Sequence, residues 1–109
     1  MDQRVKAAIA FMNANLHRKL TAIEVAQTVR LSPARLRELF KDQTGTSLTK
    51  YRRELQLERA KHLLETTFLS VKEVAVSVGL TSVGHFVTDF KSANGVTPSQ
   101  YAERNRKTS

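Results

Sequence analysis

The side chains best suited to catalysis or metal binding lie far apart in this chain of 109 residues. None of the three histidines has a cysteine or carboxylate at the spacing of a metal site: His17, His62 and His85. Glu54 and Glu58 stand one helical turn apart and resemble a carboxylate pair. Their basic neighbours Arg53 and Lys61 favour ion pairs on a helix surface instead. No serine or threonine has a nucleophile-elbow context and no glycine-rich loop could hold a phosphate, so we expect no enzyme, metal or cofactor.

The charge of the chain points to a negatively charged partner. Lysine and arginine number 18 against 10 aspartate and glutamate, which gives a formal net charge of +8 and a pI near 10.3. Charge alone leaves DNA, RNA and an anionic membrane surface open. Cysteine is absent, and no apolar stretch is long enough for a signal peptide or a membrane span. We therefore expect a soluble cytoplasmic protein.

Start and stop signals divide the chain into about seven helices. Apolar residues at three- and four-residue steps predict a first amphipathic helix over residues 3–15. Thr21 with Glu24 is the pattern of a capping box at the start of a second helix. Ser32 before Pro33 marks the start of a third. No segment alternates with a period of two, so we expect an all-α protein.

The second half of the chain repeats the construction of the first. Five residues recur at an offset of 49, as Glu24, Val25, Ala26, Val29 and Leu31 become Glu73, Val74, Ala75, Val78 and Leu80. After one inserted residue, six more recur at an offset of 50, as Leu36, Phe40, Lys41, Gly45, Ser47 and Tyr51 become Phe86, Phe90, Lys91, Gly95, Thr97 and Tyr101. This agreement is specific to an internal duplication.

One uninterrupted helix is predicted between the two copies, from Ser47 to about Thr66. Near its start one face carries Leu48, Tyr51 and Leu55, whereas a face roughly 160° away carries Leu57, Ala60, Leu63 and Leu64. Such a helix needs a different packing partner at each end. At about 1.5 Å per residue it would span roughly 30 Å, close to the distance of about 34 Å between successive major grooves. We interpret it as a rod that holds two lobes at a fixed separation.

Each copy is a capped short helix, a tight turn and a second helix, which is the layout of a helix-turn-helix motif. In such motifs the second helix enters the major groove of DNA. An alternative stays open, in which the helix pairs form a protein-interaction module without base readout and the charge only aids solubility. RNA is a third partner class, although the chain has no exposed aromatic platform of the kind that single-strand readers use.

A family resemblance extends over nearly the whole chain and is carried by Ala26, Leu31, Ser32, Leu36, Phe40, Lys41, Gly45, Tyr51, Ala60, Leu63, Leu64, Val74, Ala75, Gly79, Phe86, Phe90, Lys91, Gly95, Pro98 and Tyr101. In these residues the chain resembles the C-terminal DNA-binding domain of AraC/XylS-type transcription regulators. The resemblance implies one domain over 1–109, with a first lobe at about 3–46, a linker helix at about 47–66 and a second lobe at about 69–107. It also implies sequence-specific binding of double-stranded DNA and transcription regulation, with two recognition helices in adjacent major grooves.

The resemblance assigns base-reading candidates in the first lobe to Ala34, Arg37 and Glu38. Arg37 could donate two hydrogen bonds to a guanine edge, and Ala34 could touch a thymine methyl group. Glu38 stands where many relatives have a basic or long polar residue. It could accept a hydrogen bond from a cytosine amino group, or pair with Arg35 or Arg37 instead.

The matching positions of the second lobe are Val83, Gly84, Val87 and Thr88, where relatives often carry glutamine, arginine or other polar residues. Valine and threonine methyl groups can contact thymine methyl groups but supply little discrimination by hydrogen bonds. We therefore expect this lobe to add phosphate contacts and a readout that favours A·T pairs or DNA shape. The alternative for Val83 and Val87 is burial at the edge of the stripe formed by Phe86 and Phe90.

Two further positions depart from the family pattern. Leu80 stands where relatives usually have phenylalanine, and Gln56 where they usually have arginine. We expect a tolerated core substitution at Leu80 and a tolerated surface substitution at Gln56.

Helix N-termini and nearby hydroxyl and basic groups are the expected contacts to the DNA backbone. The phosphate-contacting candidates are Ser32, Arg35, Lys41, Arg53, Thr81, Ser82, His85 and Lys91. Each could instead be a solvated surface group, and we expect about half of them to touch phosphate.

The resemblance also bears on other partners. Relatives of this size are complete small regulators or the C-terminal part of longer chains, whose other domain senses a ligand or dimerises. We expect the isolated domain to be a monomer and a full-length protein of the longer kind to dimerise through the other domain. RNA polymerase is a further candidate partner, because an activator must contact it. No membrane partner is expected.

Overall fold

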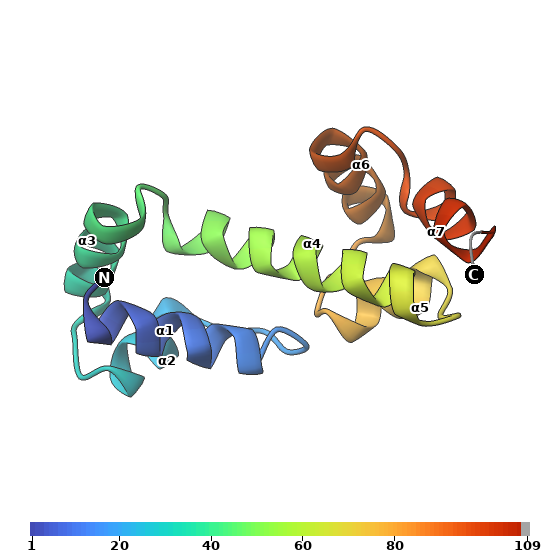
Figure 1. Cartoon of the computed structure of the whole chain (residues 1–109). Helices are drawn as coiled ribbons and strands as arrows, with labels where there is room; N and C mark the ends of the chain where they lie inside the picture. Colours follow the sequence, from blue (N-terminus) through green and yellow to red (C-terminus); the bar gives the residue numbers. More distant parts are fainter. Residues whose placement is uncertain (108–109) are drawn as a thin grey trace. The chain divides into compact units, whose positions relative to one another are not determined.

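The computed structural model describes residues 1–107 of the chain, apart from the side chain of Lys107 (Figure 1). Seven α-helices follow one another in this range: α1 (Gln3–Ala14), α2 (Ala22–Thr28), α3 (Pro33–Thr44), α4 (Leu48–Thr66), α5 (Val71–Ser77), α6 (Val83–Asn94) and α7 (Pro98–Lys107). No strand occurs in residues 1–107, and the predicted all-α fold of about seven helices is confirmed. Thr108 and Ser109, the end of the predicted domain, lie outside the described residues.

The chain divides into two compact units, an N-terminal unit (Met1–Leu55) and a C-terminal unit (Gln56–Ser109). The division falls inside α4, so each unit contains part of this helix. The first part of α4 completes a unit with α1, α2 and α3, and the remainder completes a unit with α5, α6 and α7. Each unit therefore contains one complete helix-turn-helix motif, α2–α3 or α5–α6.

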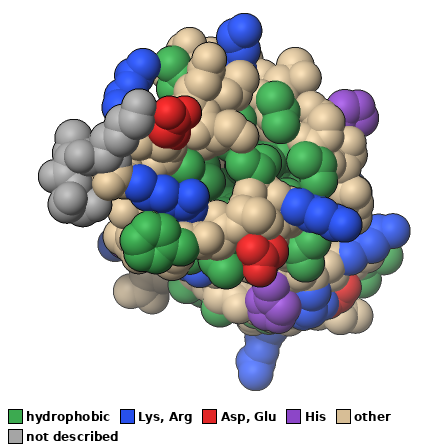
Figure 2. Space-filling model, turned by 90° about the vertical axis from the view of Figure 1, so that its right-hand side faces the viewer, with side chains coloured by type: hydrophobic (Ala, Val, Ile, Leu, Met, Phe, Trp, Pro, Cys, Tyr) green, Lys and Arg blue, Asp and Glu red, His purple; other side chains and the backbone are tan. Residues whose placement is uncertain are grey.

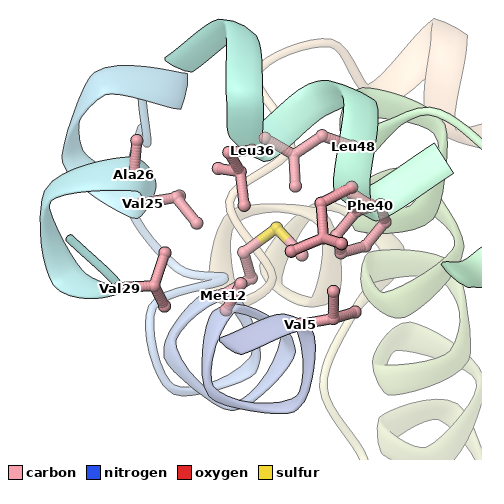
Figure 3. Packing of buried hydrophobic residues seen from close by; sticks show 10 residues of the cluster. Val5, Met12, Val25, Ala26, Val29, Leu36, Phe40 and Leu48 are labelled. Carbon is pink, nitrogen blue, oxygen red and sulfur yellow. The ribbon is translucent and has the colours of Figure 1, made fainter. Parts of the chain in front are cut away.

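The core of the N-terminal unit forms where α1, α2 and α3 meet the start of α4. Met12 projects from α1 between Leu36 and Phe40 of α3 (Figure 3). These three side chains are at most 1% exposed. The ring of Tyr51 in α4 packs edge-on against Phe40, with centroids 5.1 Å apart. The contacts fix the inner face of α3 and leave its opposite face to solvent.

The core of the C-terminal unit repeats this arrangement around two phenylalanines of α6. The rings of Phe86 and Phe90 meet edge-on with centroids 5.8 Å apart, and Tyr101 of α7 packs against Phe90 at 5.6 Å. Ala60 and Leu64 of α4 are fully buried in the same cluster. Because Tyr101 stands 50 residues after Tyr51, the duplication predicted from the sequence extends to the aromatic contacts of the core.

The apolar residues of α4 divide between the two cores as the sequence predicted. The N-terminal core takes Leu48, Tyr51 and Leu55, whereas the C-terminal core takes Leu57, Ala60, Leu63 and Leu64. With 19 residues, α4 is itself about 28 Å long. Its change of apolar face allows one helix to complete both cores.

Gln56 corrects one expectation, because its side chain is not on the surface. It is 2% exposed, and its Nε2 donates to the carbonyl of Val78 at 3.0 Å. Val78 is the C-cap residue of α5, where helix carbonyls lack partners within the helix. The amide thus fastens α4 to the end of α5 inside the C-terminal unit, and its burial is compensated by this hydrogen bond.

The turn of each helix-turn-helix motif begins with a Schellman pattern of hydrogen bonds. In the N-terminal unit, the amide of Leu31 donates to the Ala26 carbonyl at 3.0 Å, and the amide of Arg30 donates to the Gln27 carbonyl at 3.2 Å. The same two bonds recur around Gly79, at 2.9 and 3.0 Å. The pattern needs a left-handed residue, with φ of 59° at Arg30 and 82° at Gly79. Glycine adopts this conformation freely, whereas arginine is strained in it.

The first helix of each motif begins at the predicted cap. Thr21 Oγ1 accepts from the Glu24 amide at 3.2 Å, and an ion pair with Arg18 at 2.9 Å lowers the pKa of the Glu24 carboxyl. In the C-terminal unit both bonds of a capping box are formed: Ser70 Oγ accepts from the Glu73 amide, and the Glu73 carboxylate accepts from the Ser70 amide. The latter bond is the main cause of the lowered pKa of Glu73.

Two arginines fasten the chain that leads into each motif. Arg52 of α4 donates from Nη2 to the carbonyl of Arg18 at 2.6 Å. Arg106 of α7 donates from Nη2 to the carbonyls of Thr67 and Leu69, at 3.2 and 2.9 Å. Burial lowers the pKa of the Arg52 guanidinium. These bonds hold the segments before α2 and α5, and thereby the start of each motif.

Candidate nucleic-acid interface

The second helix of the N-terminal motif, α3, has one buried and one exposed face. Ser32 Oγ accepts from the Arg35 amide at 3.1 Å and starts the helix. Leu36 and Phe40 are fully buried, which fixes the rotation of α3 about its axis. The opposite face exposes the three base-reading candidates predicted in this lobe, Ala34, Arg37 and Glu38.

Glu38 forms an ion pair with Arg35 on the exposed face of α3. Arg35 Nη1 donates to Glu38 Oε1 at 2.8 Å, and the two side chains are 52% and 73% exposed. Of the two pairing alternatives left open by the sequence, the structure therefore contains the pair with Arg35. Such an exposed pair is weak and can exchange for other partners. A contact of Glu38 with a base stays a prediction.

The second helix of the C-terminal motif, α6, presents an apolar counterpart of this face. Ser82 Oγ accepts from the His85 amide at 3.2 Å and caps the helix. Val83 is 37% exposed and Val87 is partly buried, so burial at the edge of the core does not remove Val83 from solvent. Thr88 Oγ1 donates to the Gly84 carbonyl at 3.1 Å. Its hydroxyl hydrogen is thus used within α6.

The phosphate candidates lie mainly on the surface. All of them are exposed except Ser82, which is partly exposed: Ser32, Arg35, Lys41, Arg53, Thr81, Ser82, His85 and Lys91. The two capping serines use their oxygen as an acceptor, which leaves each hydroxyl hydrogen able to donate to a phosphate. Lys41 and Lys91 occupy the last turns of α3 and α6, where a positive charge is favourable. Their contacts with phosphate stay predictions.

Comparison with known proteins identifies the family. A model of the helix-turn-helix domain family matches residues 25–104. The arabinose operon regulatory protein of Escherichia coli K12 is 35% identical over 102 residues, which are 93% of this chain and 35% of that protein. The regulator ArgR of Pseudomonas aeruginosa is 33% identical over 104 residues, 95% of this chain and 31% of that protein.

A solved transcriptional regulator from Chromobacterium violaceum, described as containing an AraC-type DNA-binding domain, superimposes with a TM-score of 0.88 at 30% identity. The match covers 94% of this chain and 91% of that structure. This chain belongs to the AraC-type helix-turn-helix family. The predicted family, fold class and function class, a DNA-binding domain of transcription regulators, are thereby confirmed. The chain spans about a third of the length of the curated relatives that it matches.

Positively charged side chains are spread over one face of this AraC-type domain. On the face drawn in Figure 2, lysine and arginine side chains surround a central group of hydrophobic side chains, with few acidic side chains between them. Some arginines are engaged within the protein, as in the exposed ion pair of Arg4 with Asp2 at 3.4 Å. The net charge of +8 attracts a polyanion, and the position of the contacts then depends on particular side chains.

The described residues contain no group of three histidine, cysteine, aspartate or glutamate side chains that could hold a metal ion. Within the same residues, no helix combines the length and apolar character needed to cross a membrane. The relatives of this AraC-type domain are transcription regulators, and this class of protein binds DNA without chemical conversion of a substrate.

The use of the Thr88 hydroxyl within α6 was not predicted from the sequence. A threonine inside a helix commonly donates to the carbonyl four residues earlier, so the spacing between Gly84 and Thr88 contained the signal. Nor was the role of Arg52, whose hydrogen bond crosses 34 residues of sequence. No local pattern contains a signal for that bond.

Proposed function

We propose that α3 and α6 of this AraC-type domain read two half-sites of one DNA duplex by different chemistry. The observation that carries the proposal is the pair of exposed faces at equivalent positions of a duplicated motif, one charged and one apolar. Each face lies opposite buried aromatic side chains that fix the helix in its unit. Since the second helix of the motif is the one that enters the major groove, both faces are suited to meet base edges.

The α3 half-site is read by hydrogen bonds. Arg37 is exposed and can donate from two nitrogens to N7 and O6 of a guanine. Glu38 releases Arg35 and accepts from a cytosine amino group, while the freed Arg35 turns to a phosphate. The small side chain of Ala34 permits close approach to a thymine methyl group.

The α6 half-site is read by apolar contacts and shape. Val83, Val87 and Thr88 offer methyl groups, and the bond of Thr88 to the Gly84 carbonyl uses its hydroxyl hydrogen. Because Val83, Val87 and Thr88 have no group that could donate two hydrogen bonds to a base, they support a preference for A·T pairs more than a defined base sequence. The two half-sites are therefore unequal, and the complete site is asymmetric and about two helical turns long.

Several wider properties belong to this proposal. The protein of which the domain forms all or part regulates transcription from such a site and works in the bacterial cytoplasm. An activator of this kind contacts RNA polymerase through a surface other than the faces of α3 and α6. The isolated domain binds as a monomer, and a longer chain dimerises through another domain. The chain covers about a third of the length of its curated relatives, which supports such a further domain.

Selection from a random duplex library at near-physiological salt tests the function. The proposal expects an asymmetric site of two boxes and binding that weakens with salt. About four phosphate contacts give a slope of roughly −4 for log affinity against log salt concentration. Duplex binding that is weak and does not depend on salt would refute it and would favour the protein-interaction module. Salt-dependent binding without any selected site would refute base readout.

A further inference from the structure

Gly84 lies on the exposed face of α6, at a position where the protein itself does not require a glycine. Glycine is among the least favourable residues for a helix. A Cβ added at Gly84 would meet only Ser82 Oγ, at 3.9 Å, which is ordinary contact. Its backbone φ is not among the positive values, which in residues 1–107 occur at Arg30, Gly45, Gly79 and Gly95. Neither packing nor backbone conformation therefore explains a glycine here.

The missing side chain leaves a notch on the exposed face of α6. Helix geometry puts Val87 and Thr88 beside Gly84, because residues three and four apart are neighbours on a helix surface. Val83 precedes it and is 37% exposed. Since Thr88 Oγ1 is directed to the Gly84 carbonyl, the methyl group of Thr88 is left as its free branch. Apolar groups therefore border the notch on these sides, and Ser82 Oγ borders it on another. The equivalent position in α3 is Ala34, where a methyl group fills the corresponding space.

We propose that this notch receives the C5-methyl group of a pyrimidine in the major groove, so that the α6 half-site recognises 5-methylcytosine as well as thymine. The inference rests on the proposed function, in which α6 meets base edges. Both bases carry the methyl group on the same ring carbon. They differ in the neighbouring exocyclic group, O4 or the N4 amino group, which only a hydrogen-bonding side chain would distinguish. The walls around Gly84 read the methyl group instead.

The test uses the selected duplex with single changes in the α6 half-site. Replacing each thymine there by deoxyuridine removes one methyl group and keeps the base pairing. At the position whose methyl group enters the notch, this removal lowers the affinity about fourfold, which corresponds to the burial of one methyl group. Replacing the same T·A pair by C·G gives a similar loss, and 5-methylation of that cytosine restores about fourfold. Fluorescence anisotropy at fixed salt measures these ratios.

Gly84→Ala tests the notch without weakening the fold. The added methyl group fills the notch, so that a thymine methyl group only touches an alanine surface, as it would at Ala34. The thymine-to-deoxyuridine ratio should then fall from about four to about two, while thermal unfolding occurs at the same or a higher temperature because alanine favours the helix. The matched exchange in the other unit is Ala34→Gly, which alters binding to the α3 half-site and leaves the ratio in the α6 half-site at about four.

The outcomes separate this inference from the function on which it rests. Equal affinity for thymine and deoxyuridine at every position of the α6 half-site, with sequence-specific binding intact, overturns the inference alone. An unchanged ratio in Gly84→Ala overturns the assignment to the notch. If no duplex is bound specifically, the proposed function fails and the inference fails with it.

Discussion

Arg30 is the residue at which a single substitution should make the protein more stable. It is the left-handed residue of the turn between α2 and α3, with φ of 59°. The equivalent residue of the C-terminal unit is Gly79, and the same two hydrogen bonds surround both. Arg30→Gly therefore removes the clash between Cβ and the backbone and keeps the turn unchanged.

Two opposing terms set the size of this effect. A side chain in the left-handed conformation costs about 1–2 kcal/mol. Glycine loses more backbone freedom on folding, about 0.5–1 kcal/mol relative to alanine. The difference predicts that Arg30→Gly raises the free energy of unfolding by about 0.5–1 kcal/mol. This corresponds to a rise in melting temperature of roughly 2–8 °C for a domain of this size. The reverse change, Gly79→Ala, involves the same two terms and should lower the free energy of unfolding by about 0.5–1 kcal/mol.

Urea unfolding followed by circular dichroism at 222 nm measures these changes. Arg30→Ala is the matched control, since it removes the same charge but keeps a Cβ in the left-handed turn. We expect it to change the free energy of unfolding by less than about 0.5 kcal/mol. Equal stabilisation by Arg30→Gly and Arg30→Ala would refute backbone strain and assign the gain to the loss of positive charge. A destabilised Arg30→Gly would refute the argument outright.

Three further predictions concern other contacts of the described structure. Glu38→Gln breaks the exposed pair with Arg35, and the free energy of unfolding should change by less than about 0.5 kcal/mol. The released Arg35 can contact one more phosphate of a random duplex, so the slope of log affinity against log salt concentration should steepen by about 0.9. An unchanged slope would count against the release of Arg35. Gln56→Leu removes a buried donor and should lower the free energy of unfolding in urea by about 1–3 kcal/mol, whereas a neutral result would contradict the role of its hydrogen bond. Burial and, after it, the hydrogen bond to Glu65 raise the pKa of Tyr101 from 10.0 to about 12. The stability that neutral Tyr101 contributes is then complete below about pH 10 and is lost as the pH rises through 12. In Tyr101→Phe, the free energy of unfolding should therefore decrease less between pH 10 and pH 12 than in the natural protein.

The sequence predicted those features that depend on neighbouring residues. Ser32 before Pro33, and Ser70 three residues before Glu73, are local signals for helix starts, and both caps are present. The change of apolar face in α4 was also readable, because the buried face of a helix follows its sequence period. The duplication then fixed which helices of the two units correspond.

The sequence did not predict contacts that long polar side chains make across the fold. Gln56 was expected on the surface because its position in the helix period does not reveal that the end of α5 lies within reach of its amide. Arg52 was overlooked for the same reason. The strain at Arg30 was accessible, since the duplication aligns it with Gly79 and an unmatched glycine signals a left-handed turn. For the ion pair of Glu38, the sequence left two partners open, because Arg35 and Arg37 are both near it in the chain.

Unequal reading of two half-sites is most directly tested by substituting every base pair of the selected site in turn and measuring affinity with the natural protein, Arg37→Ala and Lys41→Ala. Both variants lose one positive charge from the surface of α3. The account predicts that Arg37→Ala abolishes a preference of about 1–3 kcal/mol for one guanine in the α3 box and leaves the other box unchanged. Lys41→Ala should weaken all sites alike. A uniform loss with Arg37→Ala as well would contradict base readout by α3 and leave only attraction to the DNA backbone.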